Sequence, residues 1–325
     1  MDDQPLKSFK SSKILVTGAA GFIGSHLAER LKKQGYDVIG VDKFSDYYDV
    51  SLKRKNESDL NKLGVTILEL DLAAATLTED LPKDVNYIFH FAARPGIAAT
   101  STFEDYLSNN VLATENLTNY TKDLEALELF INIGTSSIYG KDVFCEEDTL
   151  PKPISNYGVT KLAAEQLALS KARLGYFKAC SLRLYSVYGS RERPDKMFSQ
   201  LIECALDNEP FPLFEGSLSH RRSFTHVFDI IDGIINTIGN ESKCNGEVIN
   251  LGTAEEYTTQ QGVEMVEELV NTKISFDMKP PRTGDQTRTK AIITKAKHLL
   301  NYNPKVTLKQ GVQEQLDWIL EKRKQ

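Results

Sequence analysis

Apolar runs rich in β-branched residues alternate with amphipathic helical patterns through the first half of the chain. Strands are predicted at residues 13–17, 37–41, 65–70, 86–91, 128–133 and 179–184. Helices are predicted at residues 22–34, 104–121 and 156–173. Nearly continuous apolar strands separated by helices are typical of a parallel sheet covered on both faces. With right-handed crossovers, the pattern predicts a doubly wound α/β fold.

After residue 186 the alternation loosens, and proline and glycine gather around residues 210–216 and 280–284. One more apolar run, at residues 247–251, predicts a strand. The length of 325 residues fits two domains, or one α/β unit with a smaller lobe. We therefore predict a first domain at residues 1–185, to which a strand near residues 247–252 returns, and an interleaved second lobe over residues 186–325.

The composition is that of an ordinary globular protein, with 41% hydrophobic and 26% charged residues. The chain is too apolar to be disordered and too long for a small scaffold that depends on disulfides or a metal. Its formal charge of −6 disfavours nucleic acid or an anionic membrane surface as a partner. An anionic ligand would therefore have to be held by a few local arginines.

The four cysteines stand singly in the sequence, and the five histidines include no HExxH pair. These spacings exclude a zinc ribbon, predict no metal site and disfavour a disulfide framework. The first residues are polar, and no apolar run reaches the ~18 residues that span a bilayer. We expect a soluble, cytoplasmic protein in a reducing compartment.

A glycine-rich segment, Gly18 to Gly24, lies between the first predicted strand and the first predicted helix. Gly18 permits a tight turn, Gly21 lets the backbone approach a pyrophosphate, and Gly24 allows close helix–strand packing. The free N–H groups and the positive end of the helix dipole then face the phosphates. The segment predicts a dinucleotide site, and the alternative is a purely structural glycine turn.

Asp42 ends the second predicted strand, 24 residues beyond Gly18. A carboxylate at this position accepts from both hydroxyls of an adenosine ribose and repels a 2′-phosphate, which favours NAD over NADP. Asp71 follows the third predicted strand and is a candidate for the adenine pocket. A simple helix cap is the alternative for Asp71.

Tyr157 and Lys161 are one turn apart on the same face of a predicted helix. Tyrosine has a pKa of ~10 and is a poor base at neutral pH. A neighbouring ammonium and a positively charged nicotinamide both favour the phenolate. The pair therefore predicts a tyrosine base beside the cofactor, with an exposed helical pair as the alternative.

Thr135 stands at the end of the fifth predicted strand, where open α/β sheets place their ligands. Its hydroxyl can bind a substrate oxygen and relay a proton to the phenolate. No histidine or acid is placed to activate it, which disfavours a covalent hydrolase triad. Ser137 also fits a turn that ends the strand.

Three separated arginines lie in the predicted second lobe, namely Arg193, Arg222 and Arg282. The guanidinium fork matches both a pyrophosphate and a carboxylate. A solvated surface position is an equally open interpretation for each of them.

The glycine segment, Asp42, Thr135, Tyr157 and Lys161, in that order, resemble the extended short-chain dehydrogenase/reductase superfamily. The chain is similar to it essentially from end to end, and most of all to the NAD-dependent nucleotide-sugar 4-epimerases. The resemblance implies a Rossmann-type fold that binds NAD and a C-terminal lobe that binds a UDP-sugar. It also implies that the threonine, the tyrosine and the lysine are catalytic.

The family pattern carries over to individual positions. The residues that the resemblance places at the cofactor are Gly18, Gly21, Phe22, Ile23, Gly24, Asp42, Asp71, Leu72, Phe91, Ala92, Ala93, Asn110, Tyr157 and Lys161. The residues that it places at the substrate are Ser136, Ser137, Ser186, Arg193, Phe214, Arg222 and Arg282.

Residues 41–49 and 193–195 are similar to UDP-glucuronate 4-epimerases. In those enzymes the residues that match Ser186 and Arg193 lie by the sugar carboxylate. In the same enzymes the residue that corresponds to Phe214 packs on uracil, and the residues that correspond to Arg222 and Arg282 bind the pyrophosphate.

Three departures from the family pattern bear on the substrate. Sugar-nucleotide dehydratases carry Asp-Glu after the catalytic threonine, whereas this chain has Ser136 and Ser137, which disfavours dehydration. Ala98 follows the Gly-Ile turn where epimerases often have arginine, and residues 222–224 differ from the usual Arg-Asp-Phe. The identity of the sugar stays open.

Together, these features predict an isomerase that interconverts the C4 epimers of a UDP-sugar, with UDP-glucuronate and UDP-galacturonate as the first hypothesis. C4 is transiently oxidised, and hydride returns to the other face of the 4-keto sugar. The alternatives are a UDP-glucose or UDP-N-acetylglucosamine 4-epimerase, a dehydratase or reductase, and a catalytically silent nucleotide-binding scaffold. The resemblance also suggests a homodimer through a four-helix interface that includes the Tyr157 helix.

Overall fold

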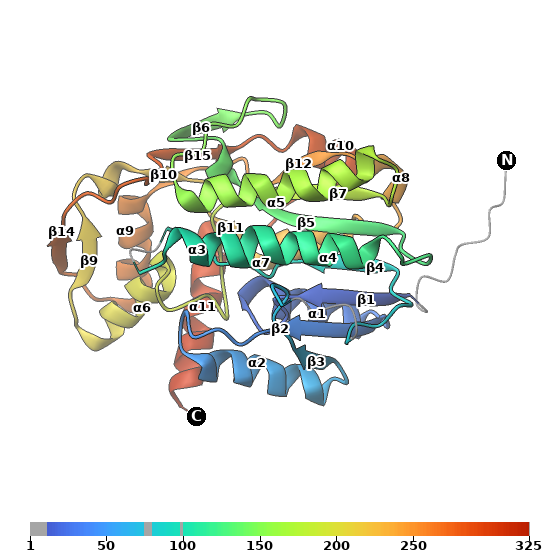
Figure 1. The fold of residues 1–325 in the computed structure, drawn as a ribbon. Helices are drawn as coiled ribbons and strands as arrows, with labels where there is room; N and C mark the ends of the chain where they lie inside the picture. Colours follow the sequence, from blue (N-terminus) through green and yellow to red (C-terminus); the bar gives the residue numbers. More distant parts are fainter. Residues whose placement is uncertain (1–11, 75–79, 98–99, 325) are drawn as a thin grey trace, which may run out of the picture.

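The computed structural model describes residues 12–74, 80–97 and 100–324. Seven parallel strands form the central sheet in the order β12-β7-β5-β4-β1-β2-β3 (Figure 1). The strands are β1 (Lys13–Thr17), β2 (Asp37–Asp42), β3 (Thr66–Glu69), β4 (Tyr87–His90), β5 (Leu129–Thr135), β7 (Ala179–Leu184) and β12 (Val248–Leu251). The strand order reverses between β1 and β4, which confirms the predicted doubly wound, Rossmann-type fold.

Both faces of the sheet are buried. Ile14 and Val16 of β1 belong to one apolar cluster and Leu15 to another, because successive side chains of a strand point to opposite faces. Helices α1 and α7 contribute to the first cluster, and α4 and α5 to the second. The helices around the sheet are α1 (Phe22–Lys33), α2 (Val50–Lys62), α3 (Phe103–Tyr106), the π-helical η3 (Leu107–Leu112), α4 (Ala113–Thr121), α5 (Asn156–Arg173), α7 (Val227–Ile235), α8 (Glu241–Cys244) and α10 (Thr294–Leu300).

A third apolar cluster forms the C-terminal lobe and includes Phe198, Phe224 and Val312. Figure 1 shows this lobe on the left, beyond the carboxyl ends of the sheet strands. Its elements are α6 (Met197–Asp207), β9 (Phe211–Phe214), α9 (Thr259–Val270), β14 (Phe276–Lys279) and α11 (Leu308–Arg323). Because the lobe stands at the end of the sheet where ligands bind in this architecture, it can close a site over the strands.

Short strands connect the two parts. One small sheet has the order β13-β10-β15-β6, and β8 pairs with β11 and β9 with β14 in two further pairs. The bounds are β6 (Asp142–Cys145), β8 (Val187–Tyr188), β10 (Arg221–Arg222), β11 (Thr225–His226), β13 (Tyr257–Thr258) and β15 (Arg288–Ala291), with short helices η4 (Ser136–Ile138) and η5 (Ser217–Ser219) beside them. In addition, β12 pairs with β7 in parallel, so the chain returns to the central sheet.

The predicted strands and helices of the first half are found with small differences at their ends. Helix α2 was not predicted, because it buries only Lys53 and Leu60 and shows no apolar stripe. The predicted helix at residues 104–121 is interrupted by the π-helical turn η3. No helix in the described part of the chain is long and apolar enough to cross a membrane.

Candidate functional site

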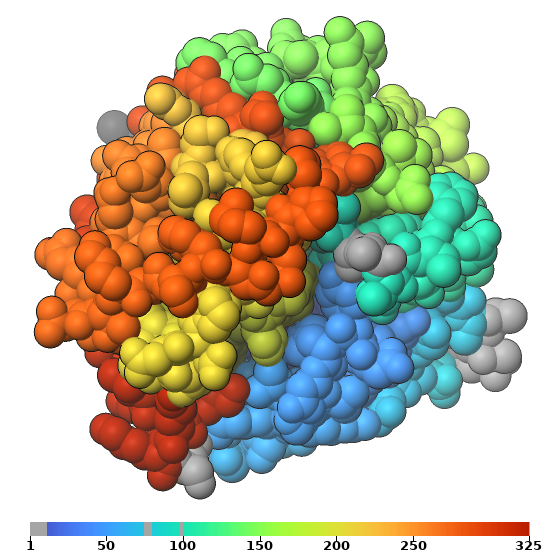
Figure 2. Space-filling view, turned by 90° about the vertical axis from the view of Figure 1, so that its left-hand side faces the viewer, coloured from blue at the N-terminus to red at the C-terminus, as the bar shows by residue number. Residues whose placement is uncertain are grey.

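A cavity of about 550 Å³ opens at the carboxyl ends of the strands. Its wall includes the glycine turn after β1, the ends of β2, β4 and β5, the start of α5, and side chains of the C-terminal lobe. Figure 2 shows the face on which the N-terminal part, in blue, meets the C-terminal lobe, in yellow and orange. The volume falls within the ~300–1,000 Å³ typical of small-molecule sites.

Asn110 is the exception among the predicted site residues, because all the others line this cavity. Its buried side-chain amide accepts the Arg94 N–H at 2.7 Å and donates to the Arg94 carbonyl oxygen at 3.3 Å and to Thr160 Oγ1 at 3.0 Å. Asn110 therefore fixes the loop after β4 to helix α5. Ala98, which departs from the family pattern, lies outside the described residues.

The glycine turn after β1 depends on the absence of side chains. Gly18 has φ of +68°, and a β-carbon there would lie 2.9 Å from the amide nitrogen of Ala92. A β-carbon at Gly24 would overlap the carbonyl oxygen of Gly18. The turn and the first turn of α1 consequently pack backbone against backbone.

Helix α1 begins at this turn and points its N-terminus into the cavity. Its N-cap, Gly21, forms no side-chain cap with any described residue, and the first turn holds no acidic side chain. Phe22, Ile23 and Gly24 line the cavity. Free N–H groups and the positive end of a twelve-residue helix fit an anionic pyrophosphate.

Asp42 is held at the end of β2 by two backbone N–H groups. Its Oδ2 accepts from Ala20 at 3.1 Å, and its Oδ1 accepts from Phe44 at 2.9 Å. Each carboxylate oxygen keeps a lone pair for a further donor. The fixed carboxylate fits the two hydroxyls of an adenosine ribose, as predicted for a site that binds NAD.

Asp71 lines the cavity and also organises its own loop. Its Oδ1 accepts from the Ala73 N–H at 2.9 Å, and its Oδ2 is 3.3 Å from Lys43 Nζ. The structure therefore combines both interpretations of this residue, as a turn cap and as part of the cavity wall.

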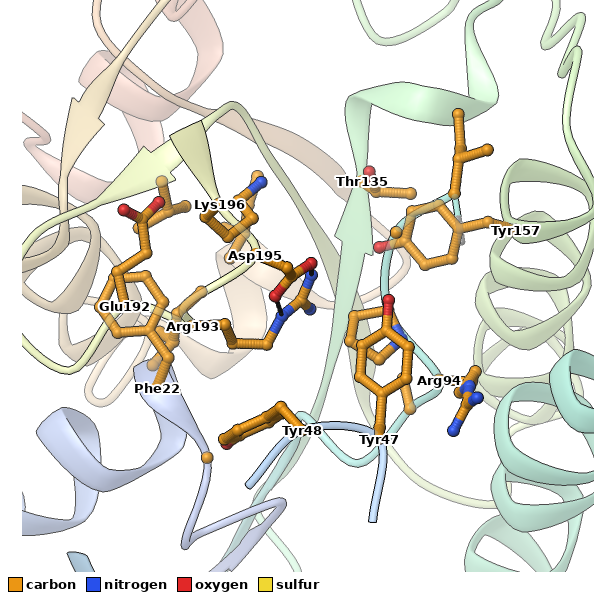
Figure 3. A pocket seen from close by; sticks show the side chains of 18 of the residues that line it. Phe22, Tyr47, Tyr48, Arg94, Thr135, Tyr157, Glu192, Arg193, Asp195 and Lys196 are labelled. Atoms are coloured by element: carbon orange, nitrogen blue, oxygen red, sulfur yellow. Dashed lines mark hydrogen bonds and ion pairs between the residues drawn. The ribbon is translucent and has the colours of Figure 1, made fainter. Parts of the chain in front are cut away.

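Thr135 and Tyr157 come together from two elements (Figure 3). Thr135 is the last residue of β5, and its Oγ1 accepts the Ser137 N–H at 3.2 Å. Ser155 caps helix α5 by accepting the Gly158 N–H at 3.1 Å, which places Tyr157 in the first turn. The two side chains share a hydrogen bond that favours the phenolate.

Burial raises the pKa of Tyr157, and the hydrogen bond to Thr135 and the charge of Arg193 oppose this shift. The protein alone thus does not produce the depressed pKa that the Tyr–Lys spacing predicts, because the hydroxyl is desolvated. Arg193, in the second lobe, is a source of stabilisation that helical spacing does not reveal. A positive charge brought by a cofactor would lower this pKa further.

Lys161 is 4% exposed and lies one turn after Tyr157 on α5. Desolvation lowers its pKa to about 8, while the charge of Glu165 raises it. Glu165 is in turn fixed by a buried ion pair, since its Oε1 is 2.7 Å from Arg183 Nη2. This pair ties α5 to β7 and sets the position of Lys161.

Arg193 enters the cavity with a partner already bound. Its Nε and Nη2 donate to the two carboxylate oxygens of Asp195, both at 2.9 Å. Ser186, at the junction of β7 and β8, lines the same cavity and has a φ of +29°. A substrate carboxylate at Arg193 would share or replace Asp195.

Arg222 and Arg282 converge on one acid. Both lie close to Asp285 Oδ1, at 3.3 and 3.2 Å. His220 Nδ1 is 3.6 Å from the other oxygen of Asp285. The Arg282 guanidinium carbon also lies 5.0 Å from the centroid of the Phe214 ring. The predicted uracil and pyrophosphate residues are therefore neighbours, and Asp285 balances one of the two guanidinium charges.

Several residues of the cavity wall were missed from the sequence, namely Tyr47, Tyr48, Lys53, Arg94, Glu192, Asp195, Lys196, His220 and Asp285. Tyr47 and Tyr48 belong to the family-like stretch 41–49, which was the available signal. Asp195 belongs to the second family-like stretch, 193–195, whereas the other side chains reach the cavity only through tertiary packing, so no local spacing identifies them.

The cavity thus combines a backbone cradle for a pyrophosphate, a fixed carboxylate for a ribose and a Thr–Tyr–Lys set. For NAD, the group expected here, the start of α1 fits the pyrophosphate and Asp42 fits the hydroxyls of the adenosine ribose. The residues therefore fit the cofactor, and the two sides of the cavity fit a dinucleotide and a second anionic ligand.

Comparison with known proteins agrees with this geometry. Residues 14–252 match the family model described as "NAD dependent epimerase/dehydratase family". The chain is 36% identical to the "Uncharacterized UDP-glucose epimerase YtcB" of Bacillus subtilis, over 94% of this chain and 98% of that protein. It is 32% identical to UDP-glucuronate 4-epimerase 3 of Arabidopsis thaliana, over 97% of this chain and 78% of the plant protein.

Among solved structures, a UDP-glucuronic acid 4-epimerase from Bacillus cereus in complex with UDP-glucuronic acid and NAD superimposes with a TM-score of 0.90. It is 35% identical to this chain, and the match covers 95% of this chain and 99% of the Bacillus cereus chain. The family match, the fold and the cofactor cradle agree: the chain belongs to the NAD dependent epimerase/dehydratase family.

Proposed function

We propose that this protein is an NAD-dependent UDP-sugar 4-epimerase whose substrate is UDP-glucuronate. The observation that carries the proposal is that Thr135, Tyr157 and Lys161 share one cavity with Arg193. The similarity to UDP-glucuronate 4-epimerases over nearly the whole chain supports it. Ser136 and Ser137 stand where an acid would be needed for dehydration, which favours epimerisation.

The cofactor would lie along the glycine turn, with its pyrophosphate at the N-terminus of α1 and its adenosine ribose at Asp42. Phe91, Ala92 and Ala93 form the adjoining wall at the end of β4. When bound, NAD supplies a hydride acceptor that returns the hydride within the same turnover, so the cycle is redox-neutral.

Tyr157 is the residue that we assign to proton transfer at the sugar 4-hydroxyl, and Thr135 binds the same oxygen. As the phenolate, Tyr157 removes the hydroxyl proton as C4 is oxidised, and it returns the proton when C4 is reduced. Lys161 stabilises the phenolate electrostatically and holds the nicotinamide ribose. Arg193 adds positive charge at the same phenol.

The substrate must be held firmly at one end and loosely at the other. Phe214, Arg222 and Arg282 are assigned to the UDP end, where their mutual contacts form a rigid cluster. Ser136, Ser137, Ser186 and Arg193 are assigned to the sugar end. Because the UDP end stays fixed, the 4-keto sugar can turn and present its other face to the returning hydride.

The test is incubation of the purified protein with UDP-glucuronate, UDP-glucose and UDP-N-acetylglucosamine in separate reactions, with the C4 epimers resolved by NMR. We expect UDP-galacturonate from UDP-glucuronate, without net absorbance change at 340 nm. Product from UDP-glucose and none from UDP-glucuronate would contradict the assigned sugar. A stoichiometric change at 340 nm would indicate a net dehydrogenase or reductase.

UDP-glucose is the second candidate substrate, since one similar protein is named as a UDP-glucose epimerase. The same catalytic set would serve it, because the chemistry occurs at C4 in both sugars. Arg193→Ala separates the two candidates: it should weaken turnover of a carboxylated sugar far more than turnover of a neutral one.

We also propose a homodimer through helices α3, η3 and α5. Phe103, Leu107, Leu112 and Val159 are apolar side chains on these helices that are 44–46% exposed. An exposed apolar set of this kind is typical of a protein–protein interface. Light scattering should give twice the monomer mass, and Leu112→Glu should reduce it to the monomer; a monomeric native protein would contradict the dimer.

Two further expectations follow from the same features. Residues 1–185, together with the strand β12, are proposed as the NAD domain, and most of residues 186–325 as the UDP-sugar lobe. A cytoplasmic location is favoured by the four free thiols among the described residues, since free thiols are typical of reducing compartments. Fractionation of the source cells tests the location.

A further inference from the structure

A phenol ring stands between two guanidinium groups beside Tyr157. The guanidinium carbon of Arg94 lies 4.2 Å from the centroid of the Tyr47 ring, and that of Arg193 lies 5.1 Å from it. Figure 3 shows Tyr47 between these two arginines, with its hydroxyl on the side of Tyr157. Both faces of an aromatic ring carry negative partial charge, so one ring can hold a cation on each side.

The two arginines differ in their electrostatic partners. Arg193 donates two hydrogen bonds to Asp195, which balances its charge. Arg94 donates its Nε–H to the neutral Ser101 Oγ at 2.8 Å and forms no ion pair with any described residue. The group of Arg94, Tyr47, Arg193 and Asp195 therefore carries one surplus positive charge, and that charge belongs to Arg94.

Arg94 is also firmly positioned. The buried amide of Asn110 binds both its backbone N–H and its backbone carbonyl, at 2.7 and 3.3 Å. The same amide donates to Thr160 on helix α5, next to Lys161. The backbone of Arg94 is thus tied to the helix that carries Tyr157 and Lys161, and the bond to Ser101 orients its guanidinium.

Two donors of this group, Arg193 Nη2 and the Tyr47 hydroxyl, lie close to the same point beside Gly96. A β-carbon at Gly96 would lie 3.5 Å from Arg193 Nη2 and 3.9 Å from the Tyr47 hydroxyl oxygen. Both side chains also act electrostatically on Tyr157. Burial raises the pKa of Tyr47, so its hydroxyl is protonated and able to donate at neutral pH.

The structure of a UDP-sugar indicates which of its groups would lie next to the Tyr47 hydroxyl and the Arg193 guanidinium. Tyr157 acts at C4, and the group that differs between a uronate and a hexose is attached to the neighbouring carbon, C5. A neutral hydroxymethyl group gains little from a surplus positive charge. A carboxylate gains both a charge-assisted hydrogen bond and the field of the cation.

We propose that Arg94, acting through Tyr47, is a specificity-determining residue that favours a carboxylate at C5 of the sugar. The Tyr47 hydroxyl donates a hydrogen bond to the carboxylate, and Arg94 adds a positive charge that forms no ion pair with a described carboxylate, in contrast to the paired charge of Arg193. The inference rests on the proposed function, because it takes Tyr157 as the group that acts at C4.

The test measures binding, so that it does not depend on turnover. In NAD-loaded protein carrying Tyr157→Phe, calorimetry gives the dissociation constants of UDP-glucuronate, UDP-glucose and UDP. The same measurements are made with Arg94→Gln and with Tyr47→Phe added. Arg54→Gln is the matched control, because Arg54 also stacks on an aromatic ring, Phe44, at 3.6 Å but does not line the cavity.

Tyr47→Phe keeps the ring and removes the hydrogen bond to the carboxylate, so it should weaken UDP-glucuronate roughly 10- to 100-fold. Arg94→Gln removes a charge that acts through space and should weaken UDP-glucuronate by about three- to tenfold, with less than about a twofold change for UDP-glucose and UDP. Arg54→Gln should change none of the three constants.

Equal weakening of all three ligands by Arg94→Gln, or no weakening of UDP-glucuronate, would overturn the inference. The proposed function is tested apart from it, by turnover of UDP-glucuronate in the native enzyme. An enzyme that epimerises UDP-glucuronate while Arg94→Gln leaves its affinity unchanged keeps the function and loses the inference. If Arg94→Gln selectively weakens UDP-glucuronate but the native enzyme does not epimerise it, the inference is kept and the proposed function is lost.

Discussion

The cofactor side of the cavity is formed mainly by backbone, whereas the substrate side is formed mainly by charged side chains. On the cofactor side, backbone makes the site: Gly18 and Gly24 permit a close packing that any β-carbon would prevent. On the substrate side, charged side chains make the site, and three of its arginines are already paired with carboxylates, whereas Arg94 forms no ion pair with a described residue. Arg193 binds Asp195, and Arg222 and Arg282 share Asp285.

This difference determines how each side binds its ligand. Backbone N–H groups at a helix end are free before the ligand arrives, so the cofactor side requires no prior bond to break. The three paired arginines, Arg193, Arg222 and Arg282, must exchange or share a carboxylate partner when an anionic ligand arrives. Net binding on that side is therefore a difference between two electrostatic interactions, which suits a ligand that has to be released in every cycle.

The largest expected effect is on the cofactor side. Gly24→Val places a side chain against the carbonyl oxygen of Gly18. The turn must then open, and we expect the loss of bound NAD and a fall in kcat/KM of at least ~1,000-fold, equivalent to ~4 kcal/mol. Cofactor content and steady-state kinetics measure this, with Lys33→Val at the exposed end of α1 as the control. If the Gly24 variant retained NAD, the cofactor side would not depend on the close backbone packing described above.

A buried ion pair joins helix α5, which carries Tyr157 and Lys161, to strand β7. Arg183 and Glu165 are 3% and 1% exposed, and Ser181 Oγ also donates to Glu165 at 3.0 Å. Arg183→Met leaves a buried carboxylate without its cation and should lower the free energy of unfolding by about 3–5 kcal/mol. Denaturant unfolding measures it. The double variant with Glu165→Met should recover much of the loss; a double variant as unstable as the single one would indicate packing as the cause.

Lys161 should reduce the stability of the cofactor-free protein at neutral pH. Its pKa in the folded state is about 8, below 10.5 in the unfolded chain, so the unfolded state binds more protons between these values and stability rises over pH 8–10.5. Lys161→Met should increase the free energy of unfolding at pH 7 by on the order of 2–3 kcal/mol, and the difference should vanish above pH 10.5. Unfolding curves at several pH values test this, with Lys33→Met as the exposed control; a less stable Lys161→Met protein at pH 7 would contradict it.

The smallest expected effect is on the substrate side, where Asp285 competes with the ligand for two arginines. Asp285→Asn keeps the shape of the side chain and removes the charge that Arg222 and Arg282 share. The arginines should then bind a diphosphate more strongly, with a three- to tenfold lower Kd for UDP, about 1 kcal/mol. Calorimetry with UDP measures it. Weaker binding of UDP would mean that Asp285 positions the arginines instead of competing with the ligand.

The same contrast explains what could be predicted from the sequence. The strands, the glycine turn and the Tyr157–Lys161 pair follow from local periodicity and spacing, and the structure places these residues at one cavity. Pairing between distant segments has no local signal, since Arg222 and Asp285 are 63 residues apart. Asn110 was assigned to the cofactor from the family pattern, whereas its amide binds the loop that carries Arg94.

The predicted state of Tyr157 illustrates a further limit. Helical spacing relates Tyr157 to Lys161, but spacing carries no information on burial. In the folded chain, desolvation raises the pKa of the tyrosine and lowers that of the lysine. Both shifts come mainly from burial, which only the tertiary structure shows.

Redox-neutral epimerisation at C4 is tested most directly with UDP-glucuronate that carries deuterium at C4, incubated with the NAD-loaded enzyme. Hydride leaves C4 and returns to the same carbon in a cavity closed by two parts of the chain. NMR and mass spectrometry should therefore find UDP-galacturonate with the deuterium retained at C4. Product with hydrogen at C4, or no UDP-galacturonate at all, would contradict the assigned reaction.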